Sequence, residues 1–250
     1  SEGQVLTMVG GVPTWGEGGP APFTLESLPF TGLWMPNYTG SPWAGTASAG
    51  DSGGRNLTSG NPASPGTAVN GNTPASFNGS ANTLDSTAEF TDLFTASAYT
   101  VVMLVKPTSP SAPEANVYDD EQLIASTAYG QFGIGWSTSG VRAWHSDSGG
   151  TRYSTDWLAC AADAWAMIEV TYNGTTLSID VNRSGAPETV SAPNIHVATS
   201  PAIVLRLGSN YAGNYTAKSV MVAGVADTVF SGDDLDNVKG AFEEILGASL

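Results

Sequence analysis

The sequence predicts an all-β fold, a two-sheet antiparallel sandwich that is closed by one short C-terminal helix. Three observations carry this prediction. Short apolar or alternating runs recur between residues 98 and 230 with turn residues between them, which is typical of a sandwich. The pair Asn173-Gly174 separates two alternating runs, which is a strong hairpin signal. Apolar residues take up helical spacing after residue 231.

The central strands are predicted from runs of β-branched and apolar residues. The run AYTVVMLVKP (98–107) is apolar and is closed by proline, which suits a central strand. Ser139-Gly140 marks a turn between two further runs. The other predicted strands lie at 131–138, 141–146, 202–209 and 217–230.

The stretch WAMIEVTYNGTTLSIDVN (165–182) is the clearest predicted hairpin. Apolar and polar residues alternate on both sides of Asn173-Gly174, so we expect a type I′ turn, whose two central residues need positive φ. We expect one face of the hairpin to lie on the core and the other in water. Glu169 and Asp180 are expected to be exposed on the wet face.

The chain is predicted to end in an amphipathic helix over residues 232–247. Ser231 and Asp234 have the spacing of an N-cap arrangement, and Gly247 fits the end of the helix. The apolar positions at helical spacing are Leu235, Val238, Phe242 and Ile245.

Composition and charge exclude several classes of function. Lys and Arg number 8 against 23 Asp and Glu, and a net charge of −15 repels phosphate backbones, so we expect no nucleic-acid partner. Cys160 is the only cysteine, which excludes an intramolecular disulfide and a thiolate metal site. The sequence holds no apolar run of about 18 residues, so we expect no membrane insertion.

Residues 1–26 are predicted to form an extended arm in front of a sandwich at 27–250. Glycine and proline recur at short intervals, so regular structure is expected to be at most a short strand around QVLTMV. The stretch GQVLTMVGGVPTWG (3–16) is nevertheless too apolar for a plain flexible tail. We therefore expect it to attach to a particle or to sister subunits through Val5, Leu6, Val12 and Trp15.

The stretch behind the arm resembles a known fold family. It reads LWMPNYTGSPWAG, then DSGG, then ASFNGSANTLDS, and then the strand that begins YTVV. It is similar to the N-terminal half of laminin-G-like, concanavalin-A-like jelly rolls. The matching residues are Trp43, Asp51-Ser52-Gly53, Phe77-Asn78-Gly79-Ser80, Leu84 and Tyr99-Thr100-Val101. The resemblance extends over about residues 30–247 and implies a jelly-roll sandwich. It implies little about function, because this fold hosts lectins, glycosidases, adhesion modules and virion parts.

The arm carries a second resemblance. Gly3-Gln4-Val5-Leu6-Thr7, followed by Pro13-Thr14-Trp15-Gly16, is similar to a segment that recurs in tail fibres and other virion appendages of bacteriophages. Such segments often lie at junctions in trimeric fibres. The resemblance therefore implies a subunit of a phage particle.

The sequence lacks the patterns of the expected enzymes. Glycosidases with this fold place carboxylates on one strand as Glu-x-Asp-x-x-Glu, and that spacing does not occur. The acidic clusters at 119–121 and 233–236 are interpreted as a loop and as the first turn of the helix. A Gly-x-Ser-x-Gly elbow is absent, and the two histidines have no metal-ligand spacing. We therefore expect no catalytic residue.

Sugar binding needs aromatic side chains beside polar groups, and the sequence offers such a set. The candidate carbohydrate-binding residues are Trp136, Trp144, His145, Tyr153, Trp157, Tyr211 and Tyr215. Packing in the core remains the alternative for each tryptophan. Ca²⁺ is the one cofactor that the resemblance allows, because many relatives bind it with Asp side chains. Its candidate ligands are Asp51, Asp119 and Asp120, with solvated loop acids as the alternative.

These observations predict a non-catalytic virion structural or decoration protein. The arm would anchor it to capsid or tail proteins and to sister subunits, in a homotrimer. The sandwich would be displayed on the virion surface, with host-surface glycans as a further ligand. The alternative is a secreted or cell-surface lectin-like module, with or without calcium, in an extracellular location.

Overall fold

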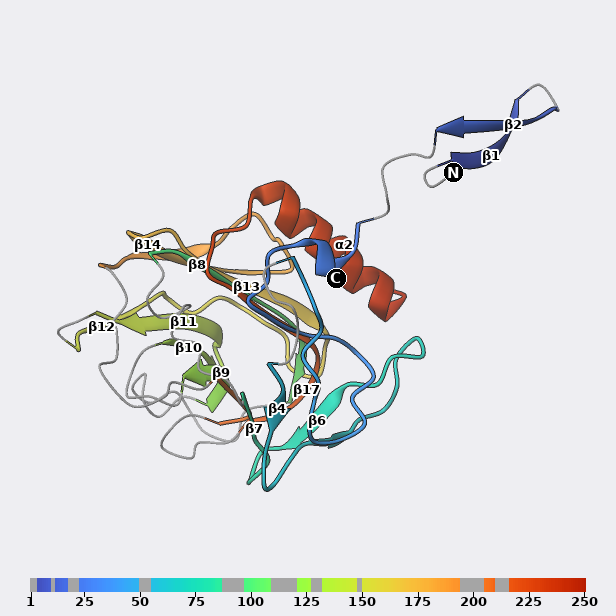
Figure 1. Cartoon of the computed structure of the whole chain (residues 1–250). Helices are drawn as coiled ribbons and strands as arrows, with labels where there is room; N and C mark the ends of the chain where they lie inside the picture. Colours follow the sequence, from blue (N-terminus) through green and yellow to red (C-terminus); the bar gives the residue numbers. More distant parts are fainter. Residues whose placement is uncertain are drawn as a thin grey trace.

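The structure is a computed structural model of the chain. It describes the backbone of residues 4–9, 12–17, 23–49, 55–86, 97–108, 121–126, 132–147, 150–193, 205–209 and 216–250. Side chains are described in all of these ranges except 4–9, 12–17 and 121–126. Within these residues the strands form two antiparallel layers, and a helix lies over one of them (Figure 1). The predicted all-β sandwich with a C-terminal helix is confirmed.

The first layer is a sheet with seven strands in the described part of the chain. Its order is β12 (Arg152–Ser154), β11 (Gly140–Ser146), β10 (Phe132–Ser137), β9 (Glu121–Ser126), β16 (Leu205–Leu207), β7 (Leu84–Ser86) and β4 (Leu57–Thr58). The strands β10, β11 and β12 are joined by short connections, so the sequence between residues 132 and 154 runs to one edge of this sheet.

The second layer has eight strands among the described residues. Its order is β15 (Glu188–Ser191), β14 (Thr176–Val181), β13 (Ala166–Tyr172), β8 (Tyr99–Pro107), β17 (Ala217–Ala226), β6 (Ala75–Asn78) and β5 (Ser64–Pro65), and β3 (Gly32–Trp34) also pairs with β17. The predicted central strand is therefore β8, which lies between β13 and β17.

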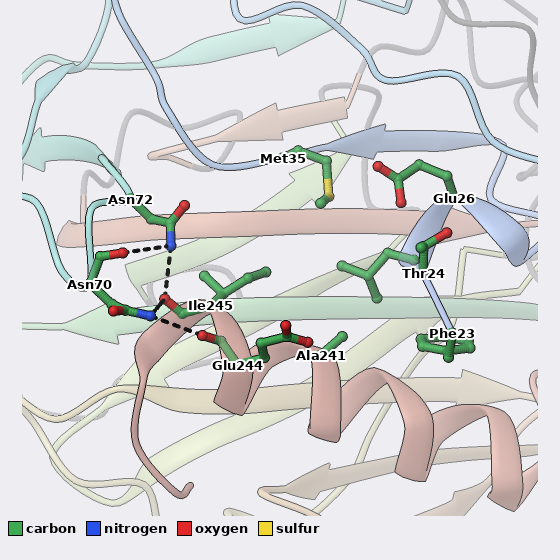
Figure 2. A pocket seen from close by; sticks show the side chains of 10 residues that line it. Phe23, Thr24, Glu26, Met35, Asn70, Asn72, Ala241, Glu244 and Ile245 are labelled. Atoms are coloured by element: carbon green, nitrogen blue, oxygen red, sulfur yellow. Dashed lines mark hydrogen bonds between the residues drawn. The ribbon is translucent and has the colours of Figure 1, made fainter. Parts of the chain in front are cut away.

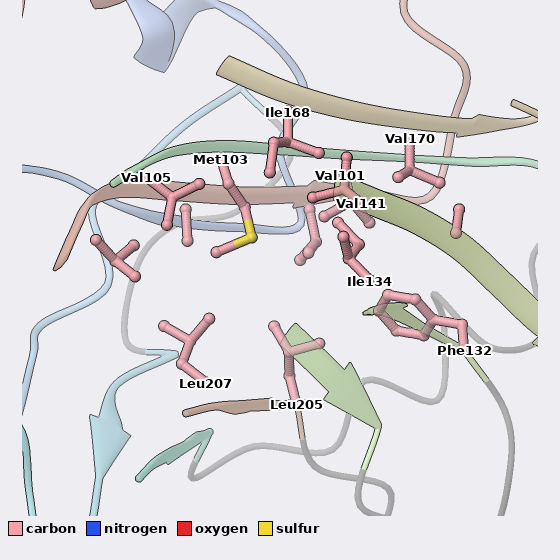
Figure 3. Close-up of a cluster of buried hydrophobic side chains, with 14 of the residues drawn as sticks. Val101, Met103, Val105, Phe132, Ile134, Val141, Ile168, Val170, Leu205 and Leu207 are labelled. Atoms are coloured by element: carbon pink, nitrogen blue, oxygen red, sulfur yellow. The ribbon is translucent and has the colours of Figure 1, made fainter. Parts of the chain in front are cut away.

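The main core lies between the two sheets. Val101, Met103 and Val105 of β8 alternate toward it and are fully buried. Figure 3 shows these side chains facing Ile134 of β10 and Leu205 of β16 across the sandwich. This face of β8 accounts for the apolar residues at every second position, because successive side chains of a strand point to opposite faces.

A second core covers the other face of the eight-stranded sheet. Val102 and Leu104 of β8 point there and pack with Val238 and Phe242 of helix α2 (Gly232–Leu246). The short 3-10 turn η1 (Leu25–Ser27) contributes the buried Leu25 to the same cluster. Residues 101–105 of β8 are all apolar, as expected of a strand that is buried on both faces. In the described residues no helix is both long and apolar enough to span a membrane.

The predicted ends of the helix are confirmed. Ser231 is the N-cap: its side-chain oxygen accepts from the Asp234 backbone N–H at 3.1 Å, and the Asp234 carboxylate accepts from the Ser231 N–H at 3.1 Å. Gly247 is the C-cap with a φ of 67°, the left-handed region that favours glycine. This reciprocal box is the one that the Ser231–Asp234 spacing predicts.

The hairpin of β13 and β14 forms as predicted, but two details were wrong. The turn lies one residue later, since Asn173 donates to the Thr176 carbonyl at 3.2 Å and only Gly174 of the expected pair has positive φ. The outer face is not wet, because Glu169 and Asp180 are 7% and 3% exposed. The start of α2 lies beside this face, where Arg183 bridges Glu169 to Asp236 of the helix.

The N-terminal segment has more regular structure than predicted. Strands β1 (Gln4–Val9) and β2 (Val12–Glu17) form an antiparallel hairpin rather than a single short strand, and they pair only with each other among the described strands (Figure 1). The register places Leu6 opposite Trp15 and Val9 opposite Val12. Two glycines lie between the strands in the sequence, and such a pair between apolar runs is a hairpin signal.

Candidate functional site

The strands β11 and β12 sort the candidate sugar-binding residues onto two faces. In β11, Val141 and Ala143 point into the main core, so Arg142 and Trp144 lie on the outer face of the sheet. The register places Trp144 opposite Ser154, and His145 opposite Tyr153. His145 and Tyr153 therefore share the core side.

The chain continues along β11 after β12 and brings Trp157 to the outer face. Val141 and Leu158 exchange two backbone hydrogen bonds, at 2.9 and 2.8 Å, which fix this segment against β11. The Arg142 guanidinium carbon then lies 4.3 Å from the centroid of the Trp157 ring. Between β11 and β12, the guanidinium carbon of Arg152 lies 3.9 Å from the centroid of the Trp144 ring.

These four residues, Arg142, Trp144, Arg152 and Trp157, are called the Trp–Arg face. Trp144 is buried at 4% exposure, whereas the other three are half-buried and reach solvent. A guanidinium stacked on an indole contributes about 0.5–2 kcal/mol, depending on its exposure. The two stacks therefore hold two indole rings and two guanidinium groups in fixed positions on one side of the sheet.

His145 belongs to a buried cluster on the core side of the same strands. Its side chain is fully buried, and its Nδ1 lies 3.3 Å from the Tyr99 hydroxyl. Its ring packs edge-on against Tyr172 with 4.6 Å between centroids. Burial lowers the pKa of His145 to about 4, against smaller opposing effects of the Pro193 carbonyl and Asp147. The imidazole is therefore neutral at pH 7.

Tyr153 and Trp136 also serve packing and internal hydrogen bonds. The half-buried Tyr153 packs against the main core, and its hydroxyl donates to Asp147 at 3.1 Å. Trp136 is 2% exposed in the core, where its Nε1 donates to the Thr108 carbonyl at 2.9 Å. The structure thus brings Trp144 and Trp157 together on the outer face and places His145, Tyr153 and Trp136 on the core side.

The remaining candidates fall elsewhere. Tyr211, Tyr215 and the candidate calcium ligands Asp51, Asp119 and Asp120 lie outside the described residues. Within the part that is described, no group of three or more His, Cys, Asp or Glu side chains could hold a metal ion. Cys160 is half-buried, and burial raises the pKa of its thiol to about 11, so the thiol is protonated and weakly reactive at neutral pH.

The two arginines were not predicted as site residues from the sequence. Arg142 stands two residues before Trp144 in VRAWHS, so a strand places both on one face. That signal was present in the sequence. The stacking of Arg152 on Trp144 depends on the register between β11 and β12, which local sequence does not give.

A separate groove of about 430 Å³ lies where the chain enters the sandwich. Figure 2 shows Phe23 and Met35 on one side of it and Ala241 and Ile245 of α2 on the other. Asn70 and Asn72 donate from their side chains to the carbonyls of Glu244, at 3.1 Å, and Ile245, at 2.9 Å. The Ile245 carbonyl, one of the last four of the helix, thereby gains a partner, while the Glu244 carbonyl also accepts from the Gly247 N–H at 3.2 Å.

Comparisons with known proteins show the fold. No protein-family model matches the chain, and no curated protein matches it. Similar solved structures include the binding domain of botulinum neurotoxin DC in complex with SialylT, with a TM-score of 0.60, 9% identity, and coverage of 87% of this chain and 51% of that one. The binding domain of Paraclostridial Mosquitocidal Protein 1 has a TM-score of 0.61 and 9% identity, and the match covers 87% of this chain and 52% of that one. A Trypanosoma rangeli sialidase in complex with 2,3-difluorosialic acid has a TM-score of 0.59 and 11% identity, and the match covers 89% of this chain and 34% of that one.

This chain spans about half the length of the toxin chains and about a third of the sialidase chain. At 9–11% identity the likeness extends to the fold alone. The fold of the sandwich is therefore one that occurs in domains described as binding domains.

Proposed function

We propose that this protein is a non-catalytic glycan-binding sandwich carried on the surface of a bacteriophage particle, with the Trp–Arg face as its glycan site. The observation that carries the proposal is the pair of indole–guanidinium stacks on one outer surface of β11 and β12. Sugars bind where an aromatic ring meets their apolar face beside donors for their oxygens. Half-buried Trp157 provides such a ring, and the half-buried Arg142 that stacks on it carries guanidinium N–H groups beside that ring.

Two further observations support binding rather than catalysis. His145, which directly follows Trp144 in the sequence, is buried on the opposite side of the strand and is neutral. Among structural neighbours, the toxin chains are binding domains, and the cell entry of botulinum neurotoxin type C is described as dependent upon interaction with two ganglioside molecules. A binding role for this chain is consistent with the binding roles of these structural neighbours.

We expect Trp157→Ala to remove glycan binding. Loss of the exposed ring should lower the affinity for any glycan that the protein binds on a glycan array by about tenfold or more, or about 1.4 kcal/mol. The matched control is Trp165→Ala. Trp165 is also half-buried and also lies near a cation, with Lys106 Nζ at 5.8 Å from its ring, but it packs against the α2 side of the other sheet. Equal loss in both variants, or hydrolysis of the glycan, would contradict the proposal.

The N-terminal hairpin supports the proposal that the protein is part of a bacteriophage particle. A two-stranded hairpin is at best marginally stable alone in water. The register of β1 and β2 places Leu6 and Trp15 on one face together with Met8 and Pro13. We infer that sister subunits or other virion proteins cover this apolar face, and that the protein assembles as a homotrimer.

We expect the double substitution Leu6→Asp and Trp15→Asp to convert the homotrimer into a monomer, because it adds two charges to the apolar face of the hairpin. Sedimentation velocity measures the change, and circular dichroism checks that the sandwich stays folded. The double substitution Thr7→Asp and Thr14→Asp, which adds two charges to the opposite face of the same hairpin, serves as the control and should remain trimeric. A wild-type protein that is monomeric and binds glycans would instead support a secreted or cell-surface lectin.

A further inference from the structure

A second pocket lies on the other sheet, beside the first turn of α2. Its volume is about 330 Å³, within the usual range for small-molecule sites. Its polar side chains come from β13, β14, the turn after β14 and the helix: they are Glu169, Thr171, Ser178, Asp180, Arg183 and Asp236. This pocket is separate from the Trp–Arg face, which lies on the seven-stranded sheet.

Arg183 is held across the pocket by a restrained turn. Its φ is 55°, in the left-handed region that residues other than glycine rarely adopt. From there its guanidinium donates to Glu169 Oε1 at 2.9 Å and to Asp236 Oδ1 at 2.9 Å. Backbone conformations of this kind persist where the surrounding structure demands them, and they occur often at ligand sites.

Asp180 supports that turn and has little capacity left for a ligand. Its Oδ1 accepts from the Val181 N–H at 2.7 Å, the Ser184 N–H at 3.1 Å and the Ser184 hydroxyl at 2.7 Å. Its Oδ2 faces the Gly185 N–H at 3.4 Å. The carboxylate of Asp180 is therefore a structural group that shapes the wall of the pocket.

Glu169 has one carboxylate oxygen without a partner. Its side chain is 9% exposed, and its Oε2 is buried without a hydrogen-bond partner in the described part of the structure. Burial raises the pKa of Glu169, while the hydrogen bond from Arg183 opposes the rise. A buried acceptor without a donor is destabilising. Because Glu169 lines the pocket, a donor on a bound ligand can complete the hydrogen bonding of this carboxylate.

The remaining chemistry selects the kind of ligand. Three carboxylates face one guanidinium here, so the formal charge of the pocket is negative when all four groups are ionised. A cationic donor is therefore favoured, and an anion is repelled. Thr171 and Ser178 contribute hydroxyl groups, while Val229, 39% exposed, and Pro187 form an apolar wall. An organic ammonium group supplies a positive charge and N–H donors together.

We propose that this pocket binds an amino-sugar residue, with its ammonium group on Glu169, its hydroxyls toward Thr171 and Ser178, and its apolar face against Val229 and Pro187. A pyranose has this division into an apolar face and a polar edge. The site goes beyond the proposed function, because it does not use the Trp–Arg face.

The test is isothermal titration of the full chain with three hexoses of similar shape and different charge. Glucosamine should bind, glucose should bind more weakly, and glucuronate should not bind. Glu169→Gln should weaken glucosamine binding by about tenfold. Its amide oxygen can still accept from Arg183, and a thermal melt checks folding. Asp236→Asn, at a side chain that is 65% exposed, is a second variant that should fold and should lower glucosamine affinity.

The matched control is Glu188→Gln in β15, which removes the same charge from a residue that does not line the pocket. Equal binding of the three hexoses, no glucosamine binding, or equal weakening by Glu169→Gln and Glu188→Gln would overturn the inference. Loss of glucosamine binding in Trp157→Ala would also overturn it, since the sugar would then occupy the Trp–Arg face, and the proposed function would stand.

Discussion

Gly140→Ala is expected to lower the free energy of unfolding by about 3 kcal/mol or more. Gly140 has a φ of 118°, where a side chain is strained, and a Cβ built on it would lie 2.0 Å from the Leu158 carbonyl oxygen. The obstacle is backbone and cannot rotate away. It would have to move, and the two hydrogen bonds between Val141 and Leu158 would be lost with it.

Gly150→Ala is a control that tests the effect of backbone strain without the clash against the Leu158 carbonyl. Gly150 also has positive φ, at 81°, but no described atom lies within 4 Å of the Cβ position. It should therefore lose about 1 kcal/mol, the cost of the backbone strain alone. Urea unfolding of both variants measures the difference. Equal losses would show that Leu158 does not press against Gly140. Because the Leu158 segment carries Trp157, Gly140→Ala should also weaken glycan binding at temperatures where it is still folded.

Acid should destabilise the protein in a pH range set by His145. The unfolded imidazole has a pKa near 6.5, while burial lowers the folded pKa to about 4. Between these values the unfolded chain binds a proton that the folded protein excludes. This contribution is therefore fully present above about pH 6.5, decreases as the pH falls toward about 4, and amounts to about 3 kcal/mol at most.

His145→Gln should flatten that pH dependence. Glutamine can accept from the Tyr99 hydroxyl but does not titrate, so the variant should be less stable at pH 7 and lose less on acidification. Urea unfolding at a series of pH values provides the measurement. His196→Gln removes the other histidine of the chain and should keep the wild-type slope. If His145→Gln keeps that slope and His196→Gln loses it, the assignment to the buried imidazole is wrong.

Local patterns predicted most of the secondary structure. The continuous run 98–107 became the central strand β8, and the Ser231–Asp234 spacing became the capping box of α2. Both depend on interactions between residues near in sequence or on burial of a whole segment. The hairpin turn moved by one residue because Asn173 uses its side-chain oxygen to accept from the Thr175 and Thr176 N–H groups, which alternation does not reveal.

The candidate site was only partly predictable for a different reason. Trp144 and His145 are adjacent in sequence, so a strand necessarily sends them to opposite faces, and the composition of the stretch could not say which face is the core. The pocket at Glu169 was missed because its wall is made by Asp236, 67 positions away in the numbering and carried there by the packing of α2. The alternation of apolar and polar residues predicted a solvent-exposed outer face for the β13–β14 hairpin. It could not show that α2 packs beside that face.

The central claim is that a glycan binds on the outer face of β11 and β12. The most direct measurement follows the indole N–H signals of the seven tryptophans by NMR while a glycan selected on an array is added. The signals of Trp157 and Trp144 should shift. The signals of Trp34, Trp43 and Trp136 should stay, because their indoles donate to backbone carbonyls inside the protein. Shifts that spare Trp157 and Trp144 while others move would contradict the claim.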